Sequence, residues 1–242
     1  MSTINTASGF RRTLSGVSLL IAPVLFAASE LLTPKQVTNA AEQLDVYAAH
    51  RSALLASSLL SIAVALTLLA GTIGIVHLVR ARGVTYANLA AVLIGYGLIT
   101  AHAGLGAIGL VFAEMVRPGL DRTAMTQLYD KITHDAPVGG PLLLGHYLLV
   151  VGIILLAVAL LRAHVGSRWA AICLLLYPIS DVVLSGAPVG DLADLVSNAL
   201  GVVSLGAYGL HLLRMRDDEW DTVTAATAAR TSLATTSVAA TA

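Results

Sequence analysis

The sequence carries little charge. Charged residues make up 12% of its 242 residues and hydrophobic residues 57%, and the mean hydropathy is +0.82. An ordinary soluble domain carries about a quarter charged residues. So few charges cannot cover a surface that faces water, but they can cover one that faces lipid, so the composition predicts a membrane protein. The formal net charge is zero, which gives no sign of a nucleic-acid partner.

Cysteine and the common catalytic motifs are also scarce. The single cysteine, Cys173, lies in an apolar run and excludes a disulfide within the chain. The sequence has no phosphate-binding loop and no HExxH, GxSxG or CxxC motif. The enzyme classes that these motifs mark are therefore not indicated.

Long apolar runs dominate what is present. Each is long enough for a helix to cross the hydrocarbon core, which takes about 20 residues. The pattern predicts an all-α polytopic membrane bundle of six transmembrane helices over residues 13–216, between disordered tails at 1–12 and 217–242. The six runs are 14–32, 52–79, 86–113, 141–161, 169–187 and 192–213.

Six spans place both termini on one side of the membrane, and the cations indicate which side. The two short turns between spans contain Arg80, Arg82, Arg162 and Arg168. Basic short loops face the cytoplasm, so we expect cytoplasmic termini and three helical hairpins, 13–82, 83–165 and 166–216. The alanine-rich composition is typical of a bacterial protein, and we expect it in the bacterial inner membrane.

Two stretches resemble each other at one constant spacing, residues 30–50 and 114–134. A Glu, a Pro and a His recur in register, which indicates duplicated structure. The first stretch predicts a surface helix that begins at Thr33–Pro34. The second predicts an amphipathic helix with Met125, Leu128 and Ile132 on its apolar face, broken by Pro137 and Pro141. The matched pairs are Glu30/Glu114, Pro34/Pro118, Ala40/Ala124, Gln43/Gln127, Leu44/Leu128 and His50/His134.

The duplicated acidic and imidazole side chains form a possible metal site. If the two stretches are related by pseudo-symmetry, Glu30, His50, Glu114 and His134 converge on the outer face. Two carboxylates and two imidazoles suit Zn²⁺ or Cu²⁺. The alternative is that the two Glu residues cap helices or pair with Arg51 and Arg117.

Three ionisable residues lie within the apolar runs, where charge is costly and often functional. Asp181 follows Pro178 by three residues, His102 lies near the middle of the third run, and His146 lies near the start of the fourth. One interpretation is a binding site for a proton, an ion or a small molecule. The other is that hydrogen bonds satisfy these side chains and fix helix packing.

A haem site is a further alternative, because haem b takes histidine ligands from facing helices. His77 with His211, and His102 with His146, would form two axial pairs. The aromatic content of only 5% and the different depths of His102 and His146 argue against it.

Residues 14–214 resemble an uncharacterised family of bacterial six-span membrane proteins of unknown function. The shared features are Glu30 at the end of the first run, the long loop after it, the basic end of the second run, and Tyr177-Pro-Ile-Ser-Asp181. The resemblance implies the six-span topology and no particular reaction.

The leading hypothesis is therefore a membrane protein that binds or transports a small molecule or ion between Asp181, His102 and His146. The two amphipathic loops would cover this site. The alternatives are a membrane-embedded metal or haem enzyme, and an assembly or structural subunit of a membrane complex. Six spans enclose little volume, so a homo-oligomer is also expected.

Overall fold

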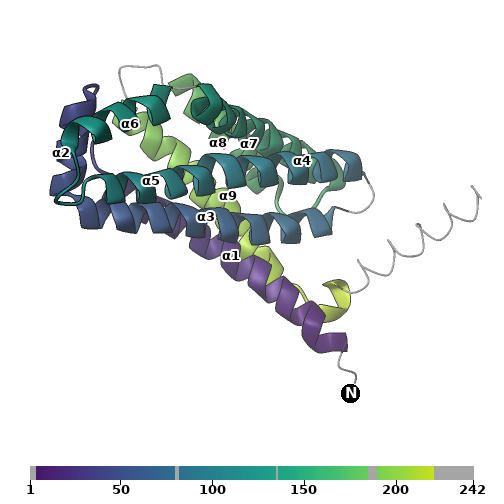
Figure 1. Cartoon of the computed structure of the whole chain (residues 1–242). Helices are drawn as coiled ribbons and strands as arrows, with labels where there is room; N and C mark the ends of the chain where they lie inside the picture. The colour runs from purple at the N-terminus through teal and green to yellow at the C-terminus, as the bar shows by residue number, and fades with distance from the viewer. Residues whose placement is uncertain (1–3, 80–81, 135, 185–189, 221–242) are drawn as a thin grey trace, which may run out of the picture.

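The computed structural model describes residues 4–79, 82–134, 136–184 and 190–220, with side chains at all of these except 4–6, 136, 181–184 and 190–194. All regular secondary structure in these ranges is helical, as predicted, and the helices are arranged lengthwise in one bundle (Figure 1). They are α1 (Ile4–Leu32), α2 (Ala40–Ala49), α3 (Arg51–Leu78), α4 (Val84–Gly97), the π-helix η1 (Leu98–Ala103), α5 (Gly104–Met115), α6 (Arg122–His134), α7 (Ala136–Ala163), α8 (Arg168–Leu184) and α9 (Gly190–Arg214).

Five segments in the described ranges are long and apolar enough to cross a membrane. They are Ala7–Leu32, Arg51–Leu78, Val84–Met115, Pro137–Ala163 and Leu195–Arg214. The fifth predicted span corresponds to α8, whose apolar segment Arg168–Ser180 is shorter than the others. The predicted multi-pass membrane protein is thus confirmed, with five clear spans and one shorter apolar helix.

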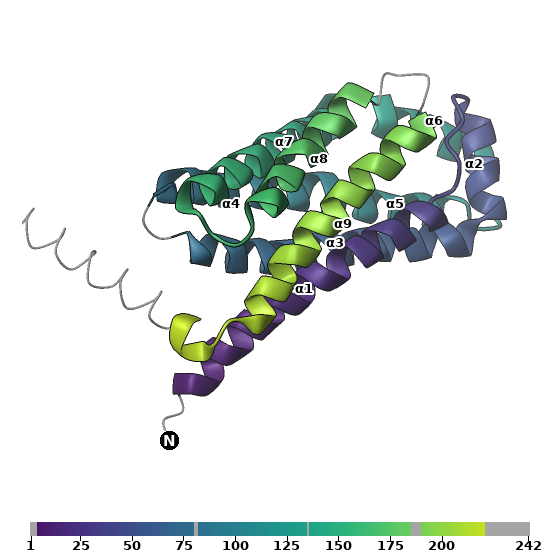
Figure 2. The ribbon, with the colours of Figure 1, turned by 180° about the vertical axis from the view of Figure 1, so that it is seen from behind.

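The long helices pack in pairs. α1 runs along α3, α4 along α7, and α8 along α9, and α1 also packs against α9 (Figures 1 and 2). The two short helices α2 and α6 lie together at one end, which we call the cap end. The other end holds the start of α1 and the end of α9, and we call it the terminal end.

Glycines allow the long helices to approach closely. A Cβ on Gly97 of α4 would lie 2.6 Å from Leu149 Cβ and 2.7 Å from Gly145 O of α7. A Cβ on Gly209 of α9 would lie 2.8 Å from Gly16 O of α1. Lipid tails are as apolar as the side chains, so such backbone contact between small residues is what holds membrane helices together.

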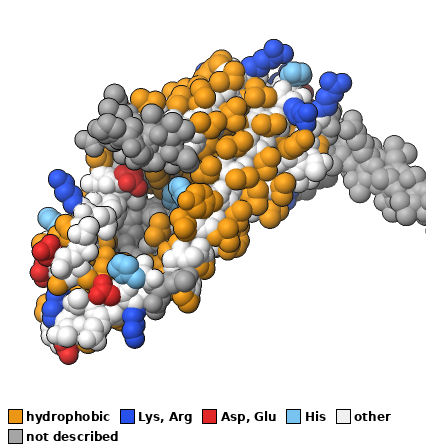
Figure 3. All heavy atoms as spheres, turned by 90° about the horizontal axis from the view of Figure 1, so that it is seen from above, with side chains coloured by type: hydrophobic (Ala, Val, Ile, Leu, Met, Phe, Trp, Pro, Cys, Tyr) orange, Lys and Arg blue, Asp and Glu red, His pale blue; other side chains and the backbone are white. Residues whose placement is uncertain are grey.

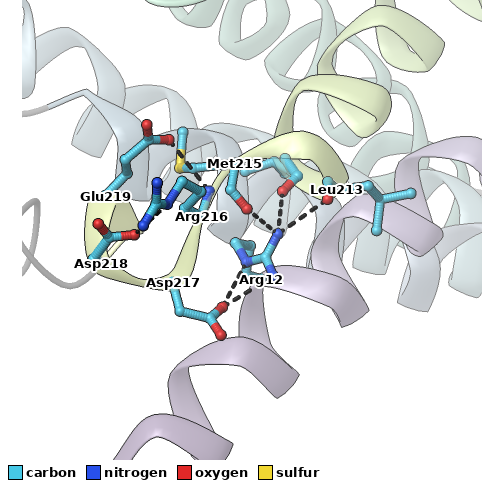
Figure 4. Close-up of polar contacts among 8 residues, drawn as sticks. Arg12, Leu213, Met215, Arg216, Asp217, Asp218 and Glu219 are labelled. Carbon is cyan, nitrogen blue, oxygen red and sulfur yellow. Dashed lines mark hydrogen bonds and ion pairs between the residues drawn. The ribbon is translucent and has the colours of Figure 1, made fainter.

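Arg12 joins the two chain ends at the terminal end. Its guanidinium donates hydrogen bonds to Leu212 O at 3.0 Å and Leu213 O at 3.1 Å, and also to Met215 O. It pairs with the Asp217 carboxylate at 3.0 Å (Figure 4). Arg12 thereby satisfies carbonyl groups that the end of α9 leaves without helical partners.

Parts of both predicted disordered tails are helical or packed in the structure. α1 begins at Ile4, so residues 4–12 form its first turns. Trp220 is buried, and its ring stacks on His77 with centroids 4.0 Å apart. The remainder of the C-terminal stretch, 221–242, lies outside the described residues.

The cap end departs from the predicted helix boundaries. Asn39 caps α2 by accepting hydrogen bonds from Ala41 N at 2.9 Å and Glu42 N at 3.1 Å. The prediction of a helix start at Thr33 is wrong, because the Thr33 hydroxyl closes α1 by donating to Ser29 O at 2.8 Å. The predicted break between the amphipathic helix and the fourth span lies earlier than expected, because α6 ends at His134 and α7 begins at Ala136 and continues through Pro141.

The two resembling stretches occupy different environments. Gln43 and Leu44 of α2 are buried, whereas their counterparts Gln127 and Leu128 of α6 are exposed. Tyr129 takes the buried position expected for Leu128, and it packs with Tyr47 and Phe112 in a separate cap cluster. Identical residues at equivalent positions of the two stretches therefore do not make equivalent contacts.

Candidate functional site

A cavity in two adjoining parts lies inside the bundle. One part has a volume of about 100 Å³ and the other about 410 Å³. The two parts share residues from α1, η1, α7, α8 and α9, so they form one continuous space. The shared residues are Phe26, His102, Leu149, Ile153, Tyr177 and Asn198.

The smaller part is apolar and central. Leu68 of α3, Leu98 of η1 and Leu156 of α7 line it from one side, and Leu174 of α8 and Leu205 of α9 line it from the other. Between it and the terminal end the core is filled by side chains that are almost wholly buried, Leu160, Tyr208 and Leu212. The cavity is therefore closed toward the terminal end.

The larger part is polar and open. Glu30, His102, His146, Ser197 and Asn198 line it. Glu30 and His146 are exposed while His102 is half-buried, so the opening lies on the side of Glu30 and His146. Glu30 stands two residues before the end of α1, which places this opening toward the cap end. No Lys or Arg among the described residues lines either part.

A π-helical turn places His102. The segment Leu98–Ala103 interrupts the helix between α4 and α5 and carries His102 into the cavity wall. The Ser61 hydroxyl of α3 donates to the His102 carbonyl at 2.9 Å, and the Phe26 ring meets the imidazole edge-on at 5.9 Å. Insertions of this kind occur frequently at functional sites, because they turn a side chain out of the regular helical register.

A proline within α8 faces the same space. Pro178 lines the polar part and lacks the N–H that would continue the helical ladder. Next to it, the Ser180 hydroxyl donates to Tyr177 O at 2.8 Å and lies 2.8 Å from the Ser197 hydroxyl of α9. These bonds tie α8 to α9 beside the proline.

The structure brings together two of the three predicted intramembrane residues. His102 and His146 line one cavity, and Glu30 joins them there. Asp181 belongs to α8, three residues beyond Pro178, and its side chain lies outside the described part of the chain. A role in ligand or proton binding stays a prediction for all three.

The four residues predicted as a metal site are spread over the cap end. Glu114 pairs with Arg51 at 2.8 Å and with Arg117 at 2.9 Å, which is the alternative interpretation of this residue. His134 is 77% exposed, and its Nδ1 lies 3.1 Å from Asp130 O. Within the described ranges, no three His, Cys, Asp or Glu side chains form a group that could hold a metal ion.

The two histidines of the predicted cytoplasmic haem pair, His77 and His211, also lie in different environments. His77 of α3 stacks on Trp220, whereas His211 of α9 lines a surface groove beside Trp169 and Arg214. Only the pair of His102 and His146 faces a common space.

Sequence reasoning missed Ser197 and Asn198. Both line the polar part of the cavity, and Ser197 is buried. The sequence could have identified Asn198, because it is an asparagine within an apolar run. Burying its amide in lipid is unfavourable, so such a residue usually has a hydrogen-bond partner or a function. The π-helix had no comparable signal, since the residues 98–103 read as an ordinary apolar helix.

The side chains that line the cavity can bind a molecule that has one polar part and one apolar part. A carboxylate, two imidazoles and an amide offer acceptors and donors at the opening, and the leucine-lined part accepts an apolar group. Comparison of the chain with known protein families, curated proteins and solved structures gives no significant match. The cavity itself is therefore the basis for assigning a function.

Proposed function

We propose that this chain is a six-span protein of the bacterial inner membrane that binds a small amphiphilic amine in the cavity and transports it. The observation that carries the proposal is that Glu30, His102 and His146 line one space that continues into an apolar interior. The polar opening would hold the charged nitrogen, and the leucine-lined part would hold the hydrocarbon.

The charge of the cavity favours a cation over an anion. Glu30 supplies a carboxylate, the imidazoles and the Asn198 amide can supply acceptors, and no described Lys or Arg lines the cavity. A carboxylate would repel an anionic head group, whereas a protonated amine would gain charge-assisted hydrogen bonds from it.

The count of six spans is supported by the position of the chain ends. Arg12 near the start of α1 contacts the carbonyls at the end of α9, so both ends lie at the terminal end. The crossings must then be even in number, and α8 supplies the sixth beside the five longer segments. Figure 3 shows Lys, Arg and His side chains at one end of the apolar surface and charges of both signs at the other. The basic end is the terminal end, which favours cytoplasmic termini.

The helix interruption at η1 supports transport rather than simple binding. η1 lines the cavity, and so does Pro178 of α8, which lacks the N–H that a helical hydrogen bond needs. Transporters commonly form substrate sites from interrupted helices. The cavity opens toward the cap end and is packed shut toward the terminal end. This corresponds to one of the two states that alternating access needs.

The test is a fluorescence titration of the detergent-purified chain with dansylcadaverine, an amphiphilic amine whose emission rises and shifts to the blue in apolar surroundings. We expect His102→Ala to weaken binding by about tenfold, because a buried hydrogen-bond partner of a charged group is lost. The matched control is His134→Ala, which removes an exposed histidine of α6.

Equal affinity of the wild type, His102→Ala and His134→Ala would contradict the proposal. So would a wild-type signal no larger than that of empty detergent micelles. Size-exclusion profiles of all three proteins establish that each is folded before the titrations are compared.

A further inference from the structure

A second site lies on the outside of the bundle, at the terminal end between α8 and α9. It is a surface groove of about 840 Å³, distinct from the central cavity. Gly166 and Ser167 of the turn before α8 form its head together with Trp169, His211 and Arg214. Its length follows one face of α9.

The groove combines a cationic head with an apolar channel. Val203, Gly206, Leu210 and Arg214 follow one another on a single stripe of α9 at helical spacing. Val203 and Leu210 are about half exposed, and nothing lies within 4 Å of the position of a Cβ on Gly206. The floor of the channel is therefore open.

The dimensions match one leaflet of a bilayer. Arg214 follows Val203 by 11 residues, or about 16 Å along the helix, and half of the hydrocarbon core measures about 15 Å. Trp169 is 53% exposed beside the head of the groove. Exposed tryptophans gather at the membrane interface, so the head of the groove lies at head-group level.

Arg214 differs from Arg12 and Arg216 at the same end. Arg12 pairs with Asp217 and Arg216 pairs with Asp218, at 3.0 and 3.1 Å. Arg214 is exposed and has no ion-pair partner within the part of the chain that the structure describes. An anion bound at the head of the groove would be the ion-pair partner of Arg214.

We propose that this groove binds an anionic phospholipid, with its phosphate on Arg214, Ser167 and His211 and an acyl chain along Val203, Gly206 and Leu210. A soluble anion would leave the apolar channel exposed. A second copy of the chain, packed about a two-fold axis, would bring two Arg214 side chains together, and their like charges disfavour it. Basic pockets between membrane helices are known as sites for acidic lipid head groups.

The test counts lipids on the detergent-purified full chain by native mass spectrometry during titration with dioleoylphosphatidylglycerol. The comparison ligands are dioleoylphosphatidylcholine and inorganic phosphate. We expect the wild type to retain the anionic lipid in preference to the zwitterionic one. Arg214→Gln should weaken retention by about fivefold, the contribution of one basic residue near a charged membrane surface.

Two further variants locate the site. Arg216→Gln is the matched control, because Arg216 is exposed, two residues away, and paired with Asp218; it should retain lipid like the wild type. Gly206→Leu places its Cβ where nothing lies within 4 Å and extends the side chain over the open floor, so it should keep the fold and displace the acyl chain.

Several results would overturn the inference. They are equal retention of the two lipids, wild-type retention by both Arg214→Gln and Gly206→Leu, or displacement of the lipid by inorganic phosphate at similar concentration. A shift of the wild type from dimer to monomer on Gly206→Leu substitution would assign the groove to a contact between copies instead.

Discussion

At the scale of single residues, the opening of the cavity and its interior offer a ligand different partners. Glu30 and His146 stand at the opening, where a charged group can exchange its water shell for fixed partners. His102 lies deeper, where the polar part meets the leucine-lined part. A neutral imidazole accepts at one nitrogen and donates at the other, so His102 can hold an amine without carrying charge itself.

Glu30→Gln tests the carboxylate directly. We expect the affinity for dansylcadaverine to fall about tenfold or more, since the charge-assisted part of the contact is lost while the shape of the side chain stays. Fluorescence titration measures the change. Glu42→Gln, an exposed position on α2, is the control and should bind as the wild type does. Equal losses in both variants would assign the effect to general surface charge.

Tyr129 of the cap cluster gives a prediction for the response to pH. Its pKa is raised to about 12, first because the ring is buried, and then through the neighbouring Tyr47 and Asp130. Ionisation is thus harder in the folded state than in the unfolded state, where the pKa is about 10. The contribution to stability is complete below pH 10 and is lost as the pH rises toward 12.

Thermal unfolding between pH 9 and 12 measures this effect. We expect Tyr129→Phe to lose less stability over this window than the wild type, because its ring cannot ionise. An identical loss in the two proteins would mean that Tyr129 already ionises near pH 10 in the folded state.

At the scale of elements, close helix contact through glycine determines how the bundle packs. Gly97→Ala on α4 forces a Cβ to within 2.6 Å of Leu149 Cβ, and we expect a loss of about 1–3 kcal/mol of stability. Gly95→Ala is the matched control in the same helix, because its Cβ would make an ordinary 3.7 Å contact with Leu69. Thermal unfolding in one detergent compares them, and an equal change in both would contradict the packing described here.

The contact between α1 and the end of α9 is the second prediction about elements. Arg12→Ala removes four polar contacts from Leu212, Leu213, Met215 and Asp217. We expect a loss of about 2 kcal/mol, typical of a hydrogen bond to a charged group, and exposure of the buried Trp220 next to it.

Tryptophan emission in a Trp169→Phe background reports on Trp220 alone. The spectrum should shift to the red in Arg12→Ala and stay unchanged in Arg11→Ala, whose arginine is exposed and lies outside this contact. An unchanged spectrum in Arg12→Ala would mean that other contacts hold the 217–220 segment.

The elements also show where sequence reasoning reached its limit. Except at the start of α1, which begins at Ile4 and not at residue 14, the apolar runs gave the long helices to within a few residues. A chain segment in lipid must be helical and long enough to cross the membrane. The start of α2 was missed because Thr33–Pro34 and Asn39 are both good capping signals, and the hydrogen bonds that decide between them are tertiary. Glu30 was grouped with His50, Glu114 and His134 from spacing alone, whereas helix packing places it with His102 and His146.

At the scale of the whole molecule, the position of the chain ends links span number to orientation. In the six-span proposal, an even number of crossings returns α9 to the side where α1 began, in agreement with the Arg12 contacts. Composition was sufficient to predict a membrane bundle. It was not sufficient to predict a cavity, because a cavity depends on which helix faces leave space between them.

Cysteine labelling in intact bacterial cells tests the topology. In a Cys173→Ser background, Gln127→Cys at the cap end should react with a maleimide that cannot cross the membrane. Arg11→Cys and Asp218→Cys should react only after the cells are opened. Labelling of one terminus but not the other in intact cells would establish an odd number of spans and contradict the six-span proposal.

The most direct test of the central claim places a fluorescent reporter in the cavity wall. Tyr177 lines both parts of the cavity, and Tyr86 lies at the start of α4, stacked under Arg162. Tyr177→Trp and Tyr86→Trp each add one tryptophan whose emission dansylcadaverine quenches when it binds nearby. We predict strong quenching of the emission added by Tyr177→Trp and little of that added by Tyr86→Trp. Equal quenching in the two variants, with the probe bound, would contradict a ligand site between His102 and His146.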